Sequence, residues 1–110
     1  MRPQTILASR PRIAVVGAGF AGLTAARELG REFAVTVLDG SPWFEWLPNI
    51  HELLSGVKRP QDLRLRHKEL TARSGHRFVQ ATVDAIDAGA GRLVTSGGRS
   101  IGFDACIVAV

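Results

Sequence analysis

The stretch "RIAVVGAGFAGLTAARELG", residues 12–30, decides the fold of this 110-residue chain. It opens with a short β-branched apolar run, residues 12–16, which is typical of a buried parallel strand. Apolar residues then recur every three positions up to Leu29, which is the spacing of a helix. A second apolar run, residues 33–40, completes a strand, helix and strand within about 30 residues, the size of a βαβ unit.

Three glycines, Gly17, Gly19 and Gly22, form G-x-G-x-x-G between the predicted strand and helix. The first permits a tight turn, the second lets a pyrophosphate approach the backbone, and the third allows close packing of helix on strand. Asp39, at the end of the second strand, can accept hydrogen bonds from ribose hydroxyls and disfavours a 2′-phosphate. The pattern therefore predicts a dinucleotide site and makes NADP the least expected of the nucleotides.

The rest of the chain predicts shorter elements. We expect a helix at about 48–54 and a second one after Asp62, which would be its N-cap. Strand-like runs separated by glycine turns cover about 76–86, 91–95 and 103–109, the middle of them as an antiparallel meander and the last as a buried parallel strand. The expected fold class is thus α/β, a Rossmann-type parallel sheet with a small antiparallel β appendage.

Length and composition favour one domain, residues 12–110, after a flexible tail at 1–11. No apolar run approaches the roughly 20 residues that span a bilayer, and the N-terminus lacks the apolar centre of a secretory signal. A lone cysteine, Cys106, has no partner for a disulfide, and the histidines are too scattered for a metal site. These features predict a cytoplasmic protein without a transmembrane segment or a metal.

Residues 58–77 are strongly basic, with seven Lys or Arg against two acids. Such a stripe can attract phosphate, nucleic acid or an acidic partner. No aromatic residue is interleaved for base stacking, which argues against nucleic acid. A solvated face is the default interpretation.

Four stretches of the chain resemble one family. "IAVVGAGFAGLTAARELG" with "VTVLD" resembles the N-terminal FAD-binding segment of the pyridine nucleotide-disulfide oxidoreductase superfamily. "WFEWLPNIHELLSG" is similar to the stretch that type II NADH dehydrogenases and apoptosis-inducing-factor-2-like proteins place beside the isoalloxazine. "FVQATVDAID" resembles the strand whose backbone at Val83 meets the adenine, and "FDACIVAV" resembles the strand leading into the family's A-T-G turn.

The resemblance implies FAD as cofactor, with NAD(P)H as co-substrate of the parent enzyme and a quinone or another acceptor receiving the electrons. From the motif and the resemblance together we expect the following cofactor-binding residues: Gly17, Ala18, Gly19, Phe20, Ala21, Gly22, Asp39, Gly40, Ser41, Pro48 and Val83. Neither the motif nor the resemblance indicates a catalytic residue. A parent enzyme of this kind can lie peripherally at a membrane.

The chain also departs from the family pattern. Members carry an NAD(P)H domain with a second GxGxxG and then complete the FAD domain, whereas this sequence stops at Val110. It is therefore expected to be the first part of a flavoprotein, truncated or split, that does not turn over alone. No C-x4-C follows the first helix, so thiol-disulfide chemistry is not expected.

Two other functions stay open from the sequence. A standalone NAD-binding domain needs only residues 12–40, and a non-catalytic interaction module could use the basic face. An unfinished sheet edge also predicts self-association or a second chain that completes the FAD domain.

Overall fold

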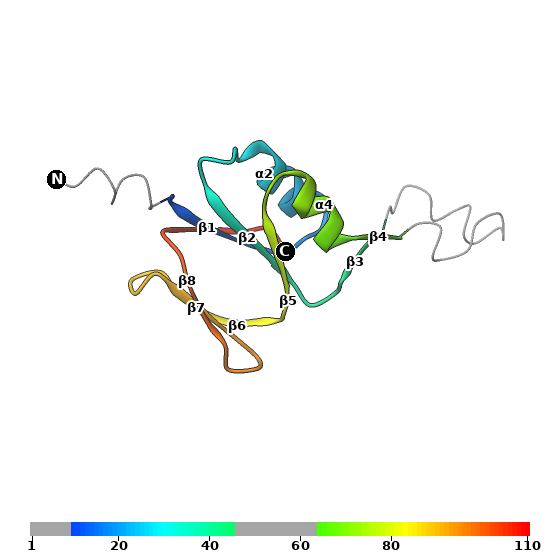
Figure 1. The fold of residues 1–110 in the computed structure, drawn as a ribbon. Coiled ribbons are helices and arrows are strands. Elements are labelled where there is room, and N and C mark those ends of the chain that lie inside the picture. The colour runs from blue at the N-terminus through cyan, green and yellow to red at the C-terminus, as the bar shows by residue number, and fades with distance from the viewer. Residues whose placement is uncertain (1–9, 46–63) are drawn as a thin grey trace.

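The computed structural model describes residues 10–45 and 64–110 of the chain (Figure 1). Its elements are β1 (Arg12–Val16), α2 (Phe20–Glu28), β2 (Ala34–Asp39), β3 (Trp43–Glu45), β4 (Arg64–Arg66), α4 (His67–Arg73), β5 (Arg77–Gln80), β6 (Val83–Asp87), β7 (Arg92–Thr95), β8 (Ser100–Gly102) and β9 (Ala105–Val108). The strand, helix and strand predicted for residues 12–40 are confirmed by β1, α2 and β2.

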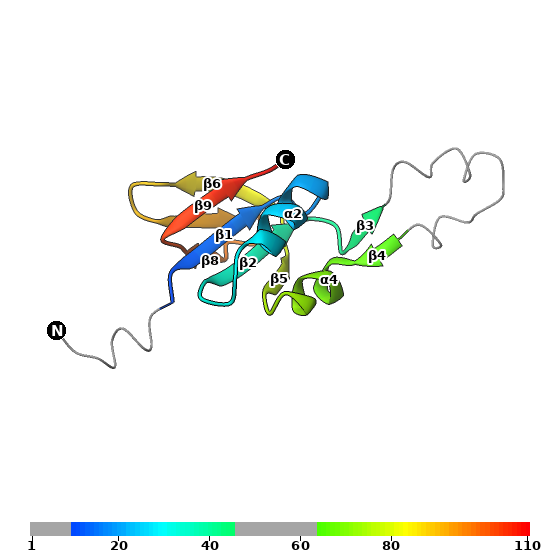
Figure 2. The same cartoon turned by 90° about the horizontal axis from the view of Figure 1, so that it is seen from above.

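A four-stranded sheet in the order β5-β2-β1-β9 forms the centre of the fold. All its pairings are parallel, and Figure 2 shows the strands side by side in this order. Val16, the last residue of β1, is opposite Leu38 in β2 and Val108 in β9. The carboxyl ends of the three strands therefore meet at one edge, and the predicted parallel strand near the end of the chain is confirmed.

The parallel sheet is covered on both faces. Figure 1 shows α2 and α4 on one side and the antiparallel sheet β6-β7-β8 on the other. Because successive side chains of a strand point to opposite faces, β1 and β2 contribute to two cores. Val15 and Val37, both 0% exposed, belong to the core under the helices, whereas Leu38 and Leu93 belong to the core between the sheets. The predicted combination of a Rossmann-type sheet and an antiparallel appendage is confirmed.

The single strand expected at about 76–86 is wrong, because the chain changes sheets within it. β5 joins the parallel sheet beside β2, and β6 pairs antiparallel with β7. At the break, the Ala81 N–H still donates to the Asp39 carbonyl at 2.9 Å, but the Thr82 carbonyl accepts from the Ser96 N–H at 2.9 Å. The backbone partner therefore switches from β2 to the turn after β7 between two neighbouring residues.

The helix expected to start after Asp62 begins later, at His67, with Arg66 in the N-cap position. It is preceded by β4, which pairs antiparallel with β3 in a ribbon that the sequence did not predict. The Pro42 carbonyl accepts the His67 N–H at 3.0 Å and ties the start of α4 to the end of this ribbon. Asp62 itself and the helix expected at 48–54 lie outside the described residues.

One exposed ion pair joins the start of β1 to the turn before β9. The Asp104 carboxylate accepts the Arg12 backbone N–H at 2.7 Å and lies 3.2 Å from the Arg12 guanidinium. The hydrogen bonds from the Arg12 side chain, followed by the bond from its backbone, lower the pKa of Asp104 below its ordinary value.

We expect Asp104→Asn to lower the melting temperature at neutral pH and to have less effect in acid. The depressed pKa means that this carboxylate stabilises the fold above its ordinary pKa of about 3.9, and that the contribution is lost as the pH falls through the folded value. Thermal unfolding at a series of pH values measures it, with Asp84→Asn, at an exposed position in β6, as the control. A difference from the wild type that stays constant below about pH 4 would contradict the assignment.

Leu93 is the second test of the fold, because it is 0% exposed between the two sheets. Leu93→Ala is expected to cost about 2–5 kcal/mol, since it removes buried methyl groups and leaves a cavity. Val94→Ala, next to it on the opposite face of β7 and 40% exposed, is the matched control and should cost much less. Denaturant unfolding of both variants gives the comparison, and equal losses would show that β6-β7-β8 is not packed on the parallel sheet.

Candidate functional site

The loop between β1 and α2 has two glycines that the fold itself requires. Gly17 has a φ of +103°, a left-handed conformation that favours glycine, and its N–H donates to the Leu38 carbonyl at 2.8 Å. A Cβ on Gly17 would lie 2.7 Å from the Ala109 carbonyl oxygen. A Cβ on Gly22 would overlap the Gly17 carbonyl oxygen. Both positions therefore exclude any larger residue, as the sequence pattern predicted for the turn and the helix packing.

Gly19 is different, because neither its conformation nor its surroundings require glycine. Its φ of −75° and ψ of −165° are extended backbone that any residue adopts. A Cβ placed there would meet no described atom within 4 Å, and the residue is exposed. The missing side chain leaves the backbone of the loop open to an approaching group.

The start of α2 gives this open position a positive electrostatic character. Gly19 is the N-cap, no side chain caps the helix, and the first turn contains no acidic residue. The first N–H groups of a helix have no acceptor within the helix, and the helix dipole places partial positive charge at this end. Phe20 is 65% exposed and Ala21 is exposed as well. An anion such as a pyrophosphate suits this helix end.

Asp39 connects the glycine loop to the end of β2. Its Oδ2 accepts the Ala18 N–H at 2.8 Å, and its Oδ1 accepts the Ser41 N–H at 2.8 Å. Ala18 is only 1% exposed, and its N–H is bound by Asp39, so its part in binding a cofactor stays a prediction. A carboxylate can accept about four hydrogen bonds, so half-buried Asp39 retains acceptor capacity for hydroxyl groups.

The start of β6 lies beside the end of β2. A Cβ on Gly40 would lie 3.0 Å from the Thr82 hydroxyl oxygen, and Val83 follows as the first residue of β6. The structure therefore brings the loop 17–22, residues 39–41 and Val83 to the carboxyl edge of the parallel sheet, although their part in binding stays a prediction. Pro48, the remaining predicted contact, lies outside the described residues.

Two aromatic residues follow Ser41 on β3. Trp43 is 36% exposed, and its ring centroid lies 5.4 Å from the Arg66 guanidinium carbon, a cation–π contact. Phe44 lines a cavity of about 300 Å³ between α2 and α4, together with Phe20 and Leu70. Phe44 and Phe20 thus line the same cavity, and the expected place of this aromatic stretch beside the isoalloxazine stays a prediction. Trp46 lies outside the described residues.

His67 is a residue of the site that the sequence analysis missed. It is 2% exposed, and its Nδ1 lies 2.8 Å from the Ser41 carbonyl oxygen, to which it donates. Its ring packs against Phe78 at a centroid distance of 5.1 Å. His67 thereby ties the start of α4 to the turn after Asp39. No local sequence signal marks it, because Ser41 is distant in the chain and the contact exists only in the folded protein.

Three further sequence expectations concern a metal site, the reactivity of Cys106 and a membrane-spanning helix. In the described ranges, no group of three His, Cys, Asp or Glu is placed to hold a metal ion. Burial raises the pKa of the Cys106 thiol, which makes it less reactive. None of the described helices has the length and apolar character needed to cross a bilayer.

The basic segment does not form one face. Arg66 lies over Trp43, Arg73 lines the cavity beside α2, and Arg77 lies in a second cavity among the first residues of β1 and β2. These cations are therefore distributed around the molecule, within the part of the segment that the structure describes.

Comparisons with known proteins identify the family of this chain. A sequence profile of the pyridine nucleotide-disulphide oxidoreductase family matches residues 11–110. The demethylphylloquinone reductase NdbB of Synechocystis is 30% identical over 113 residues, which cover 93% of this chain and 28% of that protein. The sulfide-quinone reductase of Aquifex aeolicus is 24% identical over 100 residues, covering 88% and 23%. The chain thus spans about a quarter of the length of these relatives.

Solved structures show the same fold. The sulfide:quinone oxidoreductase of Aquifex aeolicus superposes with a TM-score of 0.81 at 23% identity, over 91% of this chain and 24% of that one. NDH2 of Plasmodium falciparum superposes with a TM-score of 0.78 at 14% identity, over 93% and 22%. Since the family profile covers nearly the whole sequence, this chain belongs to the pyridine nucleotide-disulphide oxidoreductase family.

Proposed function

We propose that this chain binds the ADP half of FAD and forms the first part of the flavin site of an NAD(P)H oxidoreductase. Gly19 is the observation that carries the proposal. Gly17 and Gly22 are explained by backbone geometry and packing, but Gly19 is not, since its Cβ would meet open space and its backbone is extended. A ligand that must lie against the loop backbone explains why a side chain is absent there.

Each part of the edge has a role in this proposal. The pyrophosphate would lie against Gly19 and the first turn of α2, where the dipole favours negative charge. Asp39, held by the Ala18 and Ser41 N–H groups, would accept the ribose hydroxyls of the adenosine. Val83 and Gly40 would lie beside the adenine end, and Pro48 would contact the flavin.

The residues of this chain bind and orient the cofactor, and none of them is proposed as an acid, base or nucleophile. A bound flavin supplies hydride and electron transfer between NAD(P)H and an acceptor. Both relatives carry the name of a quinone reductase, so we propose a quinone as the acceptor of the complete protein. The Asp39 carboxylate is already fixed by two backbone donors, which reduces the ordering that cofactor binding requires.

The proposal predicts that the purified chain binds FAD in preference to NAD. Trp43 is partly exposed on β3, so we expect bound flavin to quench tryptophan fluorescence in a saturable way. Titration with FAD and, separately, with NAD measures the two affinities. Quenching by NAD alone would support a standalone NAD-binding domain instead, and no response to either would leave the interaction module as the better explanation.

We expect Gly19→Ala to weaken FAD binding without destabilising the fold. The new methyl group enters open space, so stability should be unchanged or rise by up to about 1 kcal/mol. Affinity for FAD should fall at least about tenfold, because the methyl group lies where the pyrophosphate approaches. Gly97→Ala is the matched control, since its Cβ would come no closer than 4.0 Å to a described neighbour and lies away from the loop.

Calorimetric titration and thermal unfolding of both variants give the two quantities. Equal FAD affinity in Gly19→Ala and Gly97→Ala would refute the role given to Gly19.

A further inference from the structure

A second cavity, of about 450 Å³, lies at the opposite edge of the parallel sheet, among the first residues of β1 and β2. Four arginines from three parts of the chain line it: Arg10, Arg12, Arg77 and Arg99. No Asp or Glu is among its described lining residues. We call these four residues and the cavity between them the arginine cleft.

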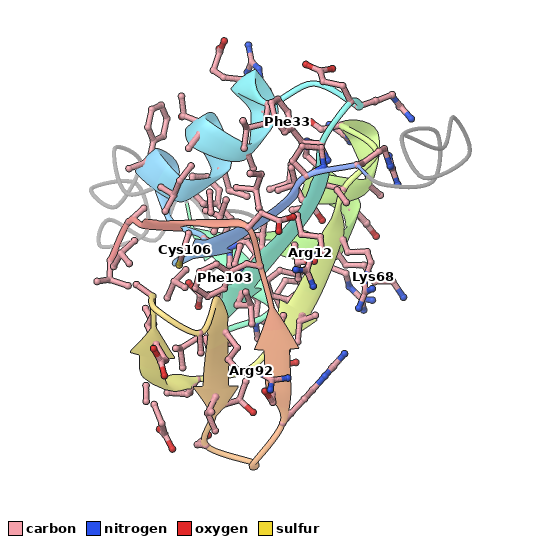
Figure 3. All side chains as sticks on the ribbon, turned by 90° about the vertical axis from the view of Figure 1, so that its left-hand side faces the viewer. Arg12, Phe33, Lys68, Arg92, Phe103 and Cys106 are labelled. Carbon is pink, nitrogen blue, oxygen red and sulfur yellow. The ribbon has the colours of Figure 1, made fainter. Side chains whose placement is uncertain are left out.

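Two of the four arginines are positioned by other groups of the protein. The Arg12 guanidinium is held by both carboxylate oxygens of Asp104, at 3.2 and 3.3 Å. A Cβ on Gly102 would lie 2.8 Å from the Arg12 Nη1, so the glycine in β8 leaves room for this guanidinium. Figure 3 shows the labelled Arg12 close to the end of β8. The Arg10 guanidinium donates to the Arg31 carbonyl at 3.0 Å.

The other two arginines have unused donors. Arg77 and Arg99 are both exposed, and within residues 10–45 and 64–110 neither guanidinium has a hydrogen-bond or ion-pair partner. In those same ranges the Arg12–Asp104 contact is the one ion pair. Four guanidiniums against one carboxylate leave three positive charges uncompensated around one cleft. Like charges brought together repel one another, so an anion bound among them would stabilise this arrangement.

We infer that the arginine cleft binds a small oligophosphate, an anion with at least two phosphoryl groups. Guanidinium is the side-chain group best matched to phosphate, because its planar fork donates two parallel hydrogen bonds. Two phosphoryl groups together carry about three negative charges at neutral pH, which matches the uncompensated charge of the cleft. The volume lies within the range of about 300–1,000 Å³ found for small-molecule sites.

This site is independent of the one proposed for FAD. It lies at the amino edge of the parallel sheet, whereas Gly19 and Asp39 lie at the carboxyl edge. It also uses guanidinium side chains, whereas the glycine loop offers backbone N–H groups. Substitutions at one edge should therefore leave the other unaffected.

Inorganic tripolyphosphate is the probe for the test. Thermal shift and calorimetric titration at constant ionic strength should show saturable binding to the purified chain. The double variant Arg77→Gln with Arg99→Gln should weaken it at least tenfold. Arg27→Gln with Arg73→Gln is the matched control, because it removes the same charge from exposed arginines that line the other cavity. Equal affinity in the two double variants, or no saturable binding to the wild type, would overturn the inference.

Two further arms identify the source of the effect. Gly19→Ala should bind tripolyphosphate as the wild type does, and loss of binding in that variant alone would assign the anion to the glycine loop. A nucleoside triphosphate should compete with tripolyphosphate, whereas an affinity for oligonucleotides that grows with their length would show a nucleic-acid surface instead. FAD binding that fails while tripolyphosphate binding persists would refute the proposed function and leave this inference standing.

Discussion

The geometry at the carboxyl edge of the parallel sheet depends on two hydrogen bonds that the Asp39 carboxylate accepts. One oxygen holds the Ala18 N–H in the glycine loop and the other holds the Ser41 N–H in the turn after β2. Ser41 in turn accepts a hydrogen bond from His67 at the start of α4. A single side chain thereby links the loop, the second strand and the second described helix. Hydrogen bonds to a charged acceptor are stronger than neutral ones, so this link is well suited to fix the loop.

The parallel sheet also holds the glycine loop in place. Gly17 donates to the Leu38 carbonyl near the end of β2, and a Cβ on Gly17 would lie 2.7 Å from the Ala109 carbonyl oxygen just after β9. The side chains of β1 and β2 are buried on both faces, so these strands cannot shift without disturbing two cores. The backbone that would meet a pyrophosphate is therefore set before any ligand arrives, which lowers the cost of ordering it on binding.

Local signals made the first half of the fold predictable. The apolar run of β1, the glycine turn and the spacing of α2 are all contained within residues 12–30, and each is decided by near neighbours. The break between β5 and β6 was missed because it depends on a change of partner, from Asp39 to Ser96, and no glycine or proline marks it. The start of α4 was also misplaced, because β4 is held by its pairing with β3 rather than by its own sequence.

The two candidate sites also differ in whether near neighbours in the sequence or distant residues form them. The glycine loop could be found from the sequence because its residues are consecutive. Only the fold, however, shows that neither the conformation nor the surroundings of Gly19 require glycine. The arginine cleft could not be found in this way, since Arg12, Arg77 and Arg99 are distant in the chain and meet only when β1, β5 and β8 assemble. The basic segment predicted from sequence contributes only Arg77 to it among the described residues.

At both candidate sites the informative feature is one that the fold does not need. A glycine with no conformational role, such as Gly19, lowers the stability of the folded state through backbone entropy. Uncompensated cations in one cleft lower it through charge repulsion. In both proposals a bound anion would supply the missing reason, through backbone donors at one edge and guanidinium groups at the other.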